Sequence, residues 1–299
     1  MSDNRIDRII ESIQGLPPLP EAVCRLCELA GDLDADIHEM ARVIAEDQAL
    51  TTRILRIANS AFYGLSGRVR TVSHAIVVLG FREIRNLALG VTVFALRYGR
   101  DRSSPLDHTD FWRHALAVAS AARMIATHVG LADPEEAYVA GLIHDVGKLV
   151  LVEHFPDEYT EALWQANSDG CPLNEAERAI LGTDHAEVGR KLCEQWKLPG
   201  ALVHGVALHH RSLEDMAKPA ENEYLASVVR LADNAARVAG VGRGGNTHMD
   251  AEPFNVPGVR VTVDAGREIL SMLSDKVRDA EALLQMAGTP GEPVEEAAG

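Results

Sequence analysis

The run Gly141-Leu-Ile-His-Asp-Val-Gly-Lys148 places an imidazole and a carboxylate inside an apolar helical segment. On an α-helix the adjacent side chains of His144 and Asp145 diverge by about 100°, yet both can converge on an ion placed between them. Lys148 lies one turn later, on the same face of the helix. Because ionisable groups in apolar surroundings need partners, the run predicts either a buried hydrogen-bonded pair or a metal site.

Other apolar helical segments carry ionisable groups in the same way: His114 with Asp110 one turn before it, His185, the pair His209-His210, and Asp233. Imidazole nitrogens and carboxylate oxygens together suit iron, manganese, zinc or nickel. The groups exceed the four ligands of a closed structural zinc site. They are numerous enough for two metals, the arrangement used for in-line attack on phosphate esters. Any one of these histidines taken alone is better explained as a hydrogen-bonded core residue, but the whole ordered set favours a metal centre.

The order of these groups along the chain resembles that of the HD superfamily of metal-dependent phosphohydrolases. Within that superfamily the chain resembles the HDOD family of bacterial signalling proteins, from about residue 15 to about residue 240. The more specific part of the resemblance is carried by Leu16-Pro-Pro-Leu-Pro20, Asp47-Gln-Ala-Leu-Thr-Thr-Arg-Ile-Leu-Arg-Ile-Ala-Asn-Ser-Ala61, Val72-Ser-His-Ala-Ile-Val-Val-Leu-Gly80, Phe111-Trp112, Leu142-Ile-His-Asp-Val-Gly-Lys148, Asp184-His-Ala-Glu-Val-Gly189 and Trp196-Lys-Leu-Pro199.

The resemblance implies a centre of one or two transition-metal ions, with iron or manganese favoured and zinc or nickel as further options. The residues expected to hold them are His114, His144, Asp145, His185, His209, His210 and Asp233, with Asp110 as a bridging or additional ligand. If the chain is an enzyme, the resemblance also implies catalytic roles for two residues. Asp145 would bridge two ions, and Lys148 would contact a substrate phosphate. The alternative for Lys148 is an ion pair with a carboxylate, or a lysine that extends to the surface.

Two departures from the family's pattern bear on function. Gln48 stands where the family usually has a helix-starting proline, and this changes only local rigidity. No Gly-Tyr-Pro follows His209-His210, although related enzymes that cleave cyclic di-GMP carry that motif. Two functions therefore stay open. The first, which the missing motif favours, is a signalling or regulatory protein with a metal centre, non-catalytic or weakly catalytic. The second is an active metal-dependent phosphohydrolase that acts on a nucleotide or cyclic dinucleotide.

The charge of the chain limits its partners. A formal net charge of −15 opposes nonspecific nucleic-acid binding, because no basic stripe is available to release phosphate counterions. It also opposes adhesion to an anionic membrane. Residues 1–15 lack the apolar core of a signal peptide, and no apolar run approaches ~18 residues. We therefore expect a cytoplasmic protein that binds a signalling protein or a small phosphate ligand, with no nucleic acid and no membrane. The sequence leaves a homodimer open.

Helix-period apolar faces along almost the whole chain predict an all-α fold. We expect an N-terminal helical subdomain at residues 1–103, packed on an HD-type helical core at residues 104–240. A short C-terminal extension, residues 241–299, should end in a disordered acidic tail. The connection near residues 100–107 is too short for the two helical regions to act independently. One continuous helix is predicted over residues 134–154, and Val259–Val263 is a rare strand signal.

Overall fold

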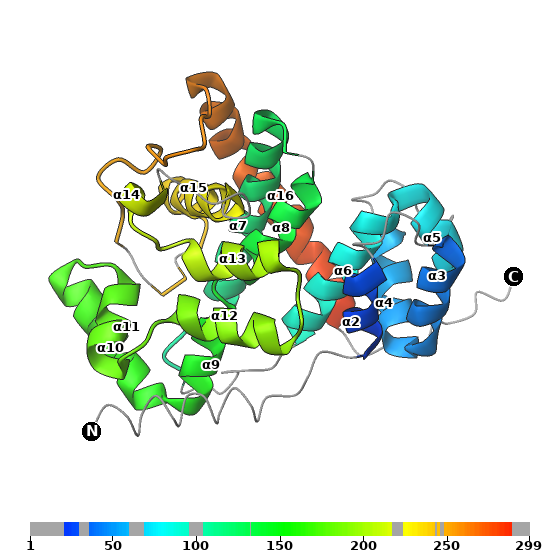
Figure 1. The fold of residues 1–299 in the computed structure, drawn as a ribbon, viewed down its shortest axis with the longest axis horizontal. Coiled ribbons are helices and arrows are strands. Elements are labelled where there is room, and N and C mark those ends of the chain that lie inside the picture. Colours follow the sequence, from blue (N-terminus) through cyan, green and yellow to red (C-terminus); the bar gives the residue numbers. More distant parts are fainter. Residues whose placement is uncertain are drawn as a thin grey trace, which may run out of the picture.

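Every regular element in the part of the chain that the structure describes is an α-helix (Figure 1). The structure is a computed structural model, and it describes residues 21–29, 36–59, 69–95, 104–131, 133–216, 224–242, 244–245 and 248–288. The all-α fold class is therefore confirmed. The Leu16–Pro20 motif and the acidic tail after residue 288 lie outside the described residues.

The first helices form one group, drawn in blue to cyan in Figure 1: α2 (Glu21–Leu29), α3 (Ile37–Glu46), α4 (Gln48–Ala58), α5 (Val72–Leu79) and α6 (Phe81–Ala95). Their apolar faces bury side chains such as Met40, Ile44 and Ile54. Helix α4 begins without a proline because the Asp47 carboxylate accepts a hydrogen bond from the backbone N–H of Leu50, at 2.9 Å. The departure at Gln48 thus leaves the start of α4 intact.

The next helices form a second group, the core: α7 (His108–Val129), α8 (Pro134–Ile143), α9 (Val146–His154), α10 (Pro156–Asp169), α11 (Leu173–Leu181), α12 (His185–Gln195), α13 (Gly200–Leu208), α14 (Leu213–Met216) and α15 (Tyr224–Ala239). Helix α7 packs against α8 and α15, while α12 packs against α9 and α13. Alanines fill much of the buried surface of α7. Because the side chains at a contact set the distance between helix axes, these small residues allow the neighbouring helices to approach α7 closely.

The helix expected over residues 134–154 is interrupted at its His-Asp pair. Helix α8 ends at Ile143 and α9 begins at Val146, so His144 and Asp145 lie in the turn between them. Asp145 has φ −98° and ψ 8°. In this turn the His144 Nε2 and Asp145 Oδ2 atoms lie 3.3 Å apart. The prediction of one continuous helix was wrong, because apolar periodicity does not register a single turn that stays buried.

The C-terminal helix α16 (Val263–Gly288) joins the two groups. It packs against α7 and α15 of the core and against α4 and α6 of the N-terminal group, and it crosses between them in orange to red in Figure 1. The strand signal at Val259–Val263 was wrong: Val259 is buried in a loop and Val263 begins α16. A short β-branched run forms a strand only where another strand pairs with it, and the described residues contain no strand.

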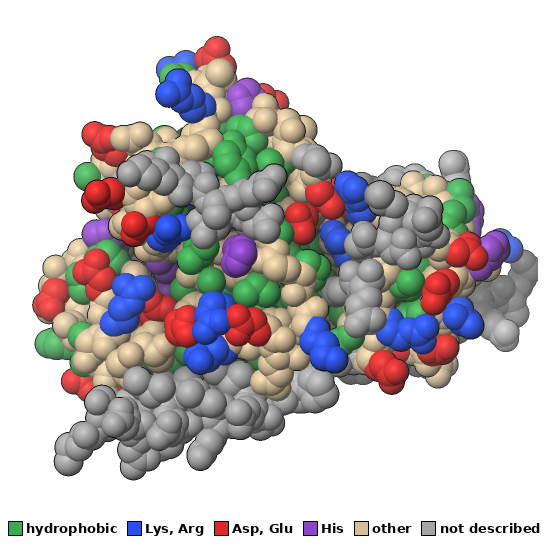
Figure 2. Space-filling model, viewed as in Figure 1, with side chains coloured by type: hydrophobic (Ala, Val, Ile, Leu, Met, Phe, Trp, Pro, Cys, Tyr) green, Lys and Arg blue, Asp and Glu red, His purple; other side chains and the backbone are tan. Residues whose placement is uncertain are grey.

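Acidic and basic side chains are interspersed over the face of the molecule drawn in Figure 2. On this face the described residues form no continuous basic stripe of the kind that tracks a nucleic-acid backbone. None of the helices in the described ranges is long and apolar enough to cross a membrane.

The contact between α6 and α8 contains the acidic side chains of Glu83 and Glu135. Burial, together with the nearby Glu83 carboxylate, raises the pKa of Glu135 from 4.5 to about 7. The folded state therefore prefers the protonated acid. This group stabilises the fold fully below about pH 4.5, and the stabilisation is lost as the pH rises through about 7. We expect Glu135→Gln to remove this loss, so the variant should gain free energy of unfolding relative to the wild type as the pH increases.

Urea unfolding between about pH 5 and about pH 8 measures this difference. Glu161→Gln, at an exposed position of α10, is the matched control for the loss of one carboxylate. A difference for Glu135→Gln that stays constant across this range would contradict the prediction.

Candidate metal centre

Five helices and turns of the core bring buried histidine and aspartate side chains to one place. His114 comes from α7, the His144-Asp145 turn joins α8 to α9, His185 begins α12, His209 and His210 follow α13, and Asp233 comes from α15. Their ligand atoms form two groups, each with all its atoms within 4.8 Å of one another. One group consists of Asp145, His185, His209 and His210, and the other of His114, His144 and Asp233.

Asp145 lies between the two groups. Its Oδ1 atom is 3.2 Å from His185 Nε2 and 3.9 Å from His209 Nε2. Its Oδ2 atom is 3.3 Å from His144 Nε2 and 3.8 Å from His114 Nε2. Because each oxygen of the carboxylate faces a different group, Asp145 could offer one oxygen to an ion held by each group.

Backbone hydrogen bonds fix the tautomers of two of the histidines. The Nδ1–H group of His144 donates to the carbonyl of Gly141, and that of His209 donates to the carbonyl of Val206, both at 2.7 Å. In a neutral imidazole this leaves a lone pair on Nε2. Both Nε2 atoms are buried and have no hydrogen-bond partner in the described residues, as is also true of Asp145 Oδ1. A metal ion requires lone pairs that point toward it, on imidazole rings whose orientation is fixed by a hydrogen bond from the other ring nitrogen.

His185 is held by a residue that the sequence gave no reason to select. Its Nδ1–H group and its backbone N–H both donate to the Glu177 carboxylate, at 2.5 Å and 2.8 Å. Burial alone would lower the pKa of His185, but the Glu177 and Asp145 carboxylates together outweigh burial and raise that pKa to about 9. A metal ion at Nε2 must therefore compete with a proton, and its binding releases that proton.

The pKa values of five of the other groups are shifted toward the charge states that metal ligands need. Burial lowers the pKa of His114, and lowers the pKa values of His209 and His210 well below their usual range. Burial alone would raise the pKa of Asp145, but His144 and Lys148 hold it well below its usual range. Arg237 holds the pKa of Asp233 low in the same way, against the effect of burial.

Lys148 is buried in the centre, with 1% of its surface exposed. Its ammonium group donates to Asp145 Oδ2 at 2.6 Å and to the backbone carbonyl of Gly244 at 2.8 Å. The alternative of a lysine that reaches the surface is thereby excluded, whereas the alternative of a carboxylate partner holds. Gly244 has φ +56°, and a Cβ atom there would lie 2.8 Å from the His114 ring, so the loop after α15 needs glycine at this point.

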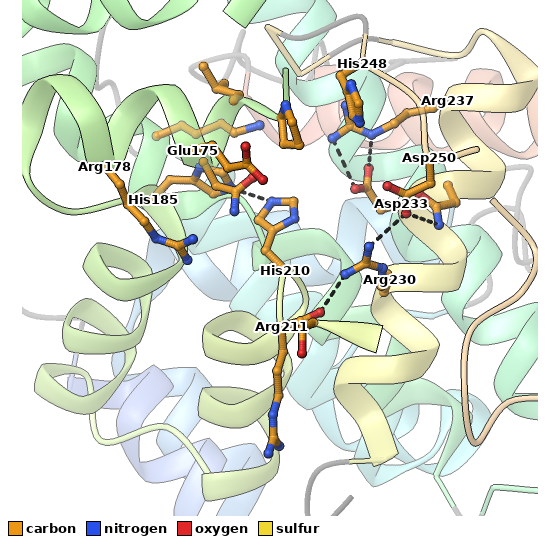
Figure 3. Close-up of a pocket in the computed structure, with 16 residues that line it drawn as sticks. Glu175, Arg178, His185, His210, Arg211, Arg230, Asp233, Arg237, His248 and Asp250 are labelled. Atoms are coloured by element: carbon orange, nitrogen blue, oxygen red, sulfur yellow. Dashed lines mark hydrogen bonds and ion pairs between the residues drawn. The ribbon is translucent and has the colours of Figure 1, made fainter. Parts of the chain in front are cut away.

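A cavity of about 370 Å³ opens beside the ligands (Figure 3). His185, His210, Asp233 and Lys148 line its inner end. Figure 3 shows His185 and His210 pointing toward each other, and their Nε2 atoms are 2.9 Å apart. The arrangement can therefore present bound metal ions, together with one ammonium group, to a small molecule that enters the cavity.

A sequence profile of the HDOD domain matches residues 16–212 of the chain. The chain belongs to the HDOD family. The match covers all the candidate ligands in the two groups except Asp233, which lies beyond it on α15.

Solved structures agree with the HDOD assignment. An HDOD domain protein of unknown function from Geobacter sulfurreducens is 26% identical, with a TM-score of 0.75, and the match covers 95% of this chain and 98% of that one. A protein from Shewanella amazonensis, provisionally assigned as a phosphohydrolase, is also 26% identical, with a TM-score of 0.68 and coverage of 94% and 97%.

Among curated proteins, ribonuclease Y of Treponema denticola is 25% identical over 93% of this chain and 50% of its own length. An uncharacterised protein of Treponema pallidum is 25% identical over 77% of this chain and 44% of its own length. The HDOD chain thus spans about half the length of the curated relatives it matches.

One ligand predicted for this HDOD chain lies apart from the others. Asp110 belongs to neither of the two groups of ligand atoms. It lies half-buried in the first turn of α7, where its backbone N–H donates to the carboxylate of Asp107 at 3.0 Å. Asp110 lies one helical turn before His114, near the start of α7, and this position leaves it outside the metal centre.

Several residues of the HDOD site carried no signal of their own in the sequence. Arg237 is the exception, because it follows Asp233 by one helical turn in the sequence. In the structure its Nε atom donates to Asp233 Oδ1 at 2.9 Å. The others come from separate helices and loops that only the fold brings together: Glu177, Asn174, Arg178, Arg230 and Asp250.

Proposed function

We propose that this chain is an HDOD regulatory protein whose centre binds one or two transition-metal ions, with iron or manganese favoured and zinc or nickel as alternatives. The observation that carries the proposal is the set of unpartnered, buried Nε2 atoms that face one another around Asp145. Burying such polar atoms without partners costs free energy, and metal ions would satisfy all of them together. When bound, the ions would supply positive charge and Lewis acidity to a phosphate group.

The chemistry of the cavity supports a small phosphate ligand as the signal. The inner end combines the ligand groups with Lys148, whose ammonium would meet a phosphate oxygen as a point charge. A signalling protein that responds to the occupied site, and a second copy of the chain, are further proposed partners.

A second candidate function is an active metal-dependent phosphohydrolase that acts on a nucleotide or cyclic dinucleotide. The observation in its favour is that the cavity reaches His185, His210 and Lys148 directly. The observation against it is that no Gly-Tyr-Pro follows His209-His210. In this candidate Asp145 and Lys148 are the catalytic residues.

Elemental analysis of protein purified without chelator tests the metal centre. The expected result is one or two equivalents of a transition metal in each chain. Less than about a tenth of an equivalent, even after growth with added iron or manganese, would contradict the proposal, because site occupancy follows directly from affinity.

Turnover by the wild-type protein separates the two candidate functions, and Lys148→Ala tests the role of the ammonium group in the enzyme candidate. If the chain is an enzyme, the variant should keep its metal and hydrolyse bis(p-nitrophenyl) phosphate about 100-fold more slowly, the size of effect seen when one transition-state donor is removed. Lys191→Ala, on the partly exposed surface of α12, is the control and should leave the rate unchanged. A wild-type protein loaded with iron, manganese, zinc or nickel that turns over neither this ester nor a cyclic dinucleotide would contradict the enzyme candidate and leave the regulatory proposal in place.

A further inference from the structure

The cavity beside the metal centre has two chemically different ends. Its inner end is formed by His185, His210, Asp233 and Lys148, which face the proposed ions. Its outer wall is formed by residues from α11, α15 and the loop around residues 248–250. The hydrogen-bonding groups and charges of this wall determine which chemical groups, besides a phosphate, a ligand of the site can carry.

Four of the cationic side chains that line the cavity already hold an acidic partner. Lys148 pairs with Asp145, Arg178 with Asp184, Arg230 with Asp250, and Arg237 with Asp233. A further lining residue, Arg211, points away from the others in Figure 3. Because these four cations of the described residues are each balanced by a carboxylate, bound ions at the inner end would supply most of the surplus positive charge in the cavity. The site therefore offers strong attraction for an anionic group at one end only.

The outer wall is polar and includes fixed hydrogen-bonding groups. The Arg230 guanidinium is only 15% exposed, and it donates to the carbonyl of Arg211 at 2.7 Å and to the Asp250 carboxylate at 2.9 Å. Its Nε atom is buried without a partner in the described residues, and so is the Oδ1 atom of Asn174, a residue that is 5% exposed. Asn234 donates to the carbonyl of Pro253 at 2.8 Å. Donors and acceptors of this kind suit the edges of a sugar or a nucleobase.

The same wall disfavours a second phosphate. Asp250 on this wall is already paired with Arg230, and Glu175 adds a further carboxylate. A second phosphate there would compete with Asp250 for Arg230 and would have no metal ion to attract it. The volume of about 370 Å³ is also near the lower limit of ligand pockets, which range from ~300 to ~1,000 Å³. A ligand with two phosphates and two bases would have to place one of each against this wall or outside the cavity.

Building on the proposed function, we infer that the cavity binds a single mononucleotide, with its phosphate at the metal end and its sugar and base against Arg230 and Asn174. A cyclic dinucleotide is not the ligand of this site. The inference concerns the identity of the ligand and not whether the ligand is hydrolysed.

Calorimetric binding to the full chain loaded with manganese tests this inference, with the metal content of each sample measured first. The probes are adenosine and guanosine 5′-monophosphate, inorganic phosphate and cyclic di-GMP. At least one mononucleotide should bind about tenfold more tightly than inorganic phosphate and cyclic di-GMP, which corresponds to one or two added hydrogen bonds. Arg230→Gln should lose this advantage over phosphate while it keeps its metal and its affinity for phosphate itself.

Two further variants keep the test decisive. Asn174→Ala should also reduce the advantage, and it covers the case in which Arg230→Gln does not fold. Arg190→Gln is the matched control, because Arg190 also pairs with acidic neighbours, Glu187 and Glu194, but lies outside the cavity on α12. A wild-type sample without metal would contradict the proposed metal centre itself. A metal-loaded sample that binds cyclic di-GMP as tightly as the mononucleotides, or whose preference survives both cavity variants, would overturn the inference about the ligand alone.

Discussion

Gly147→Ala is expected to destabilise the protein by about 3 kcal/mol or more. Gly147 lies where α9 meets α12, and a Cβ atom there would lie 2.0 Å from the His185 carbonyl oxygen and 2.7 Å from the Gly189 nitrogen. Both contacts are with backbone atoms, so no change of rotamer can relieve them. The two helices must separate, and His185 must then move away from Asp145. We therefore expect the metal content to fall together with the stability.

Thermal unfolding followed by circular dichroism measures this effect, and the Tm should fall by at least ~6 °C for a chain of this size. Gly200→Ala is the matched control, because a Cβ atom at Gly200 meets no atom within 4 Å. That variant should keep the wild-type Tm or exceed it slightly. A Gly147→Ala protein with the wild-type Tm would show that the helices tolerate a methyl group at this crossing.

The ligand set illustrates what a sequence can reveal about a buried site. His114, His185 and Asp233 each interrupt an apolar helical face, and a polar group in that position needs a partner wherever the chain folds. Helical periodicity is a local property, so most helices of the core also follow from the pattern. The structure brings these residues to one place because each lies on the buried side of its own helix.

Residues whose role depends on the packing of distant segments could not be predicted from helical periodicity in the sequence. Glu177 supports His185 from a separate helix, and its sequence neighbourhood does not distinguish it from Glu175, which only lines the cavity. Gly244 contacts Lys148 across 96 positions of the chain. Asp110 shows the converse: a spacing of four places it on the same face of α7 as His114, but about 6 Å nearer the start of the helix, and it belongs to neither group of ligand atoms. The turn at His144 is also a property of tertiary packing.

Asp145→Asn and Asp145→Ala are both expected to lose at least about nine-tenths of the bound metal. Asp145 is the only described carboxylate placed between the two groups of ligand atoms. Asparagine keeps its shape and can still accept a hydrogen bond from Lys148, but it lacks the negative charge that offsets two cations. Alanine removes the charge and the hydrogen bond together, which leaves a buried ammonium group without its carboxylate and should cost about 3–5 kcal/mol of stability.

The pair of variants separates loss of metal from loss of fold. Asp145→Asn should retain the helical circular dichroism spectrum while its metal content falls, whereas Asp145→Ala should lose both metal and stability. Asp264→Ala, at a side chain that is 96% exposed at the start of α16, is the control and should change neither. If Asp145→Asn kept its full metal content, the carboxylate would not bridge the ions, and the two groups of ligand atoms would have to bind metal independently. Loss of metal from a folded Asp145→Asn protein would instead mean that one carboxylate links both groups, so that His114 on α7 and His185 on α12 depend on the same turn.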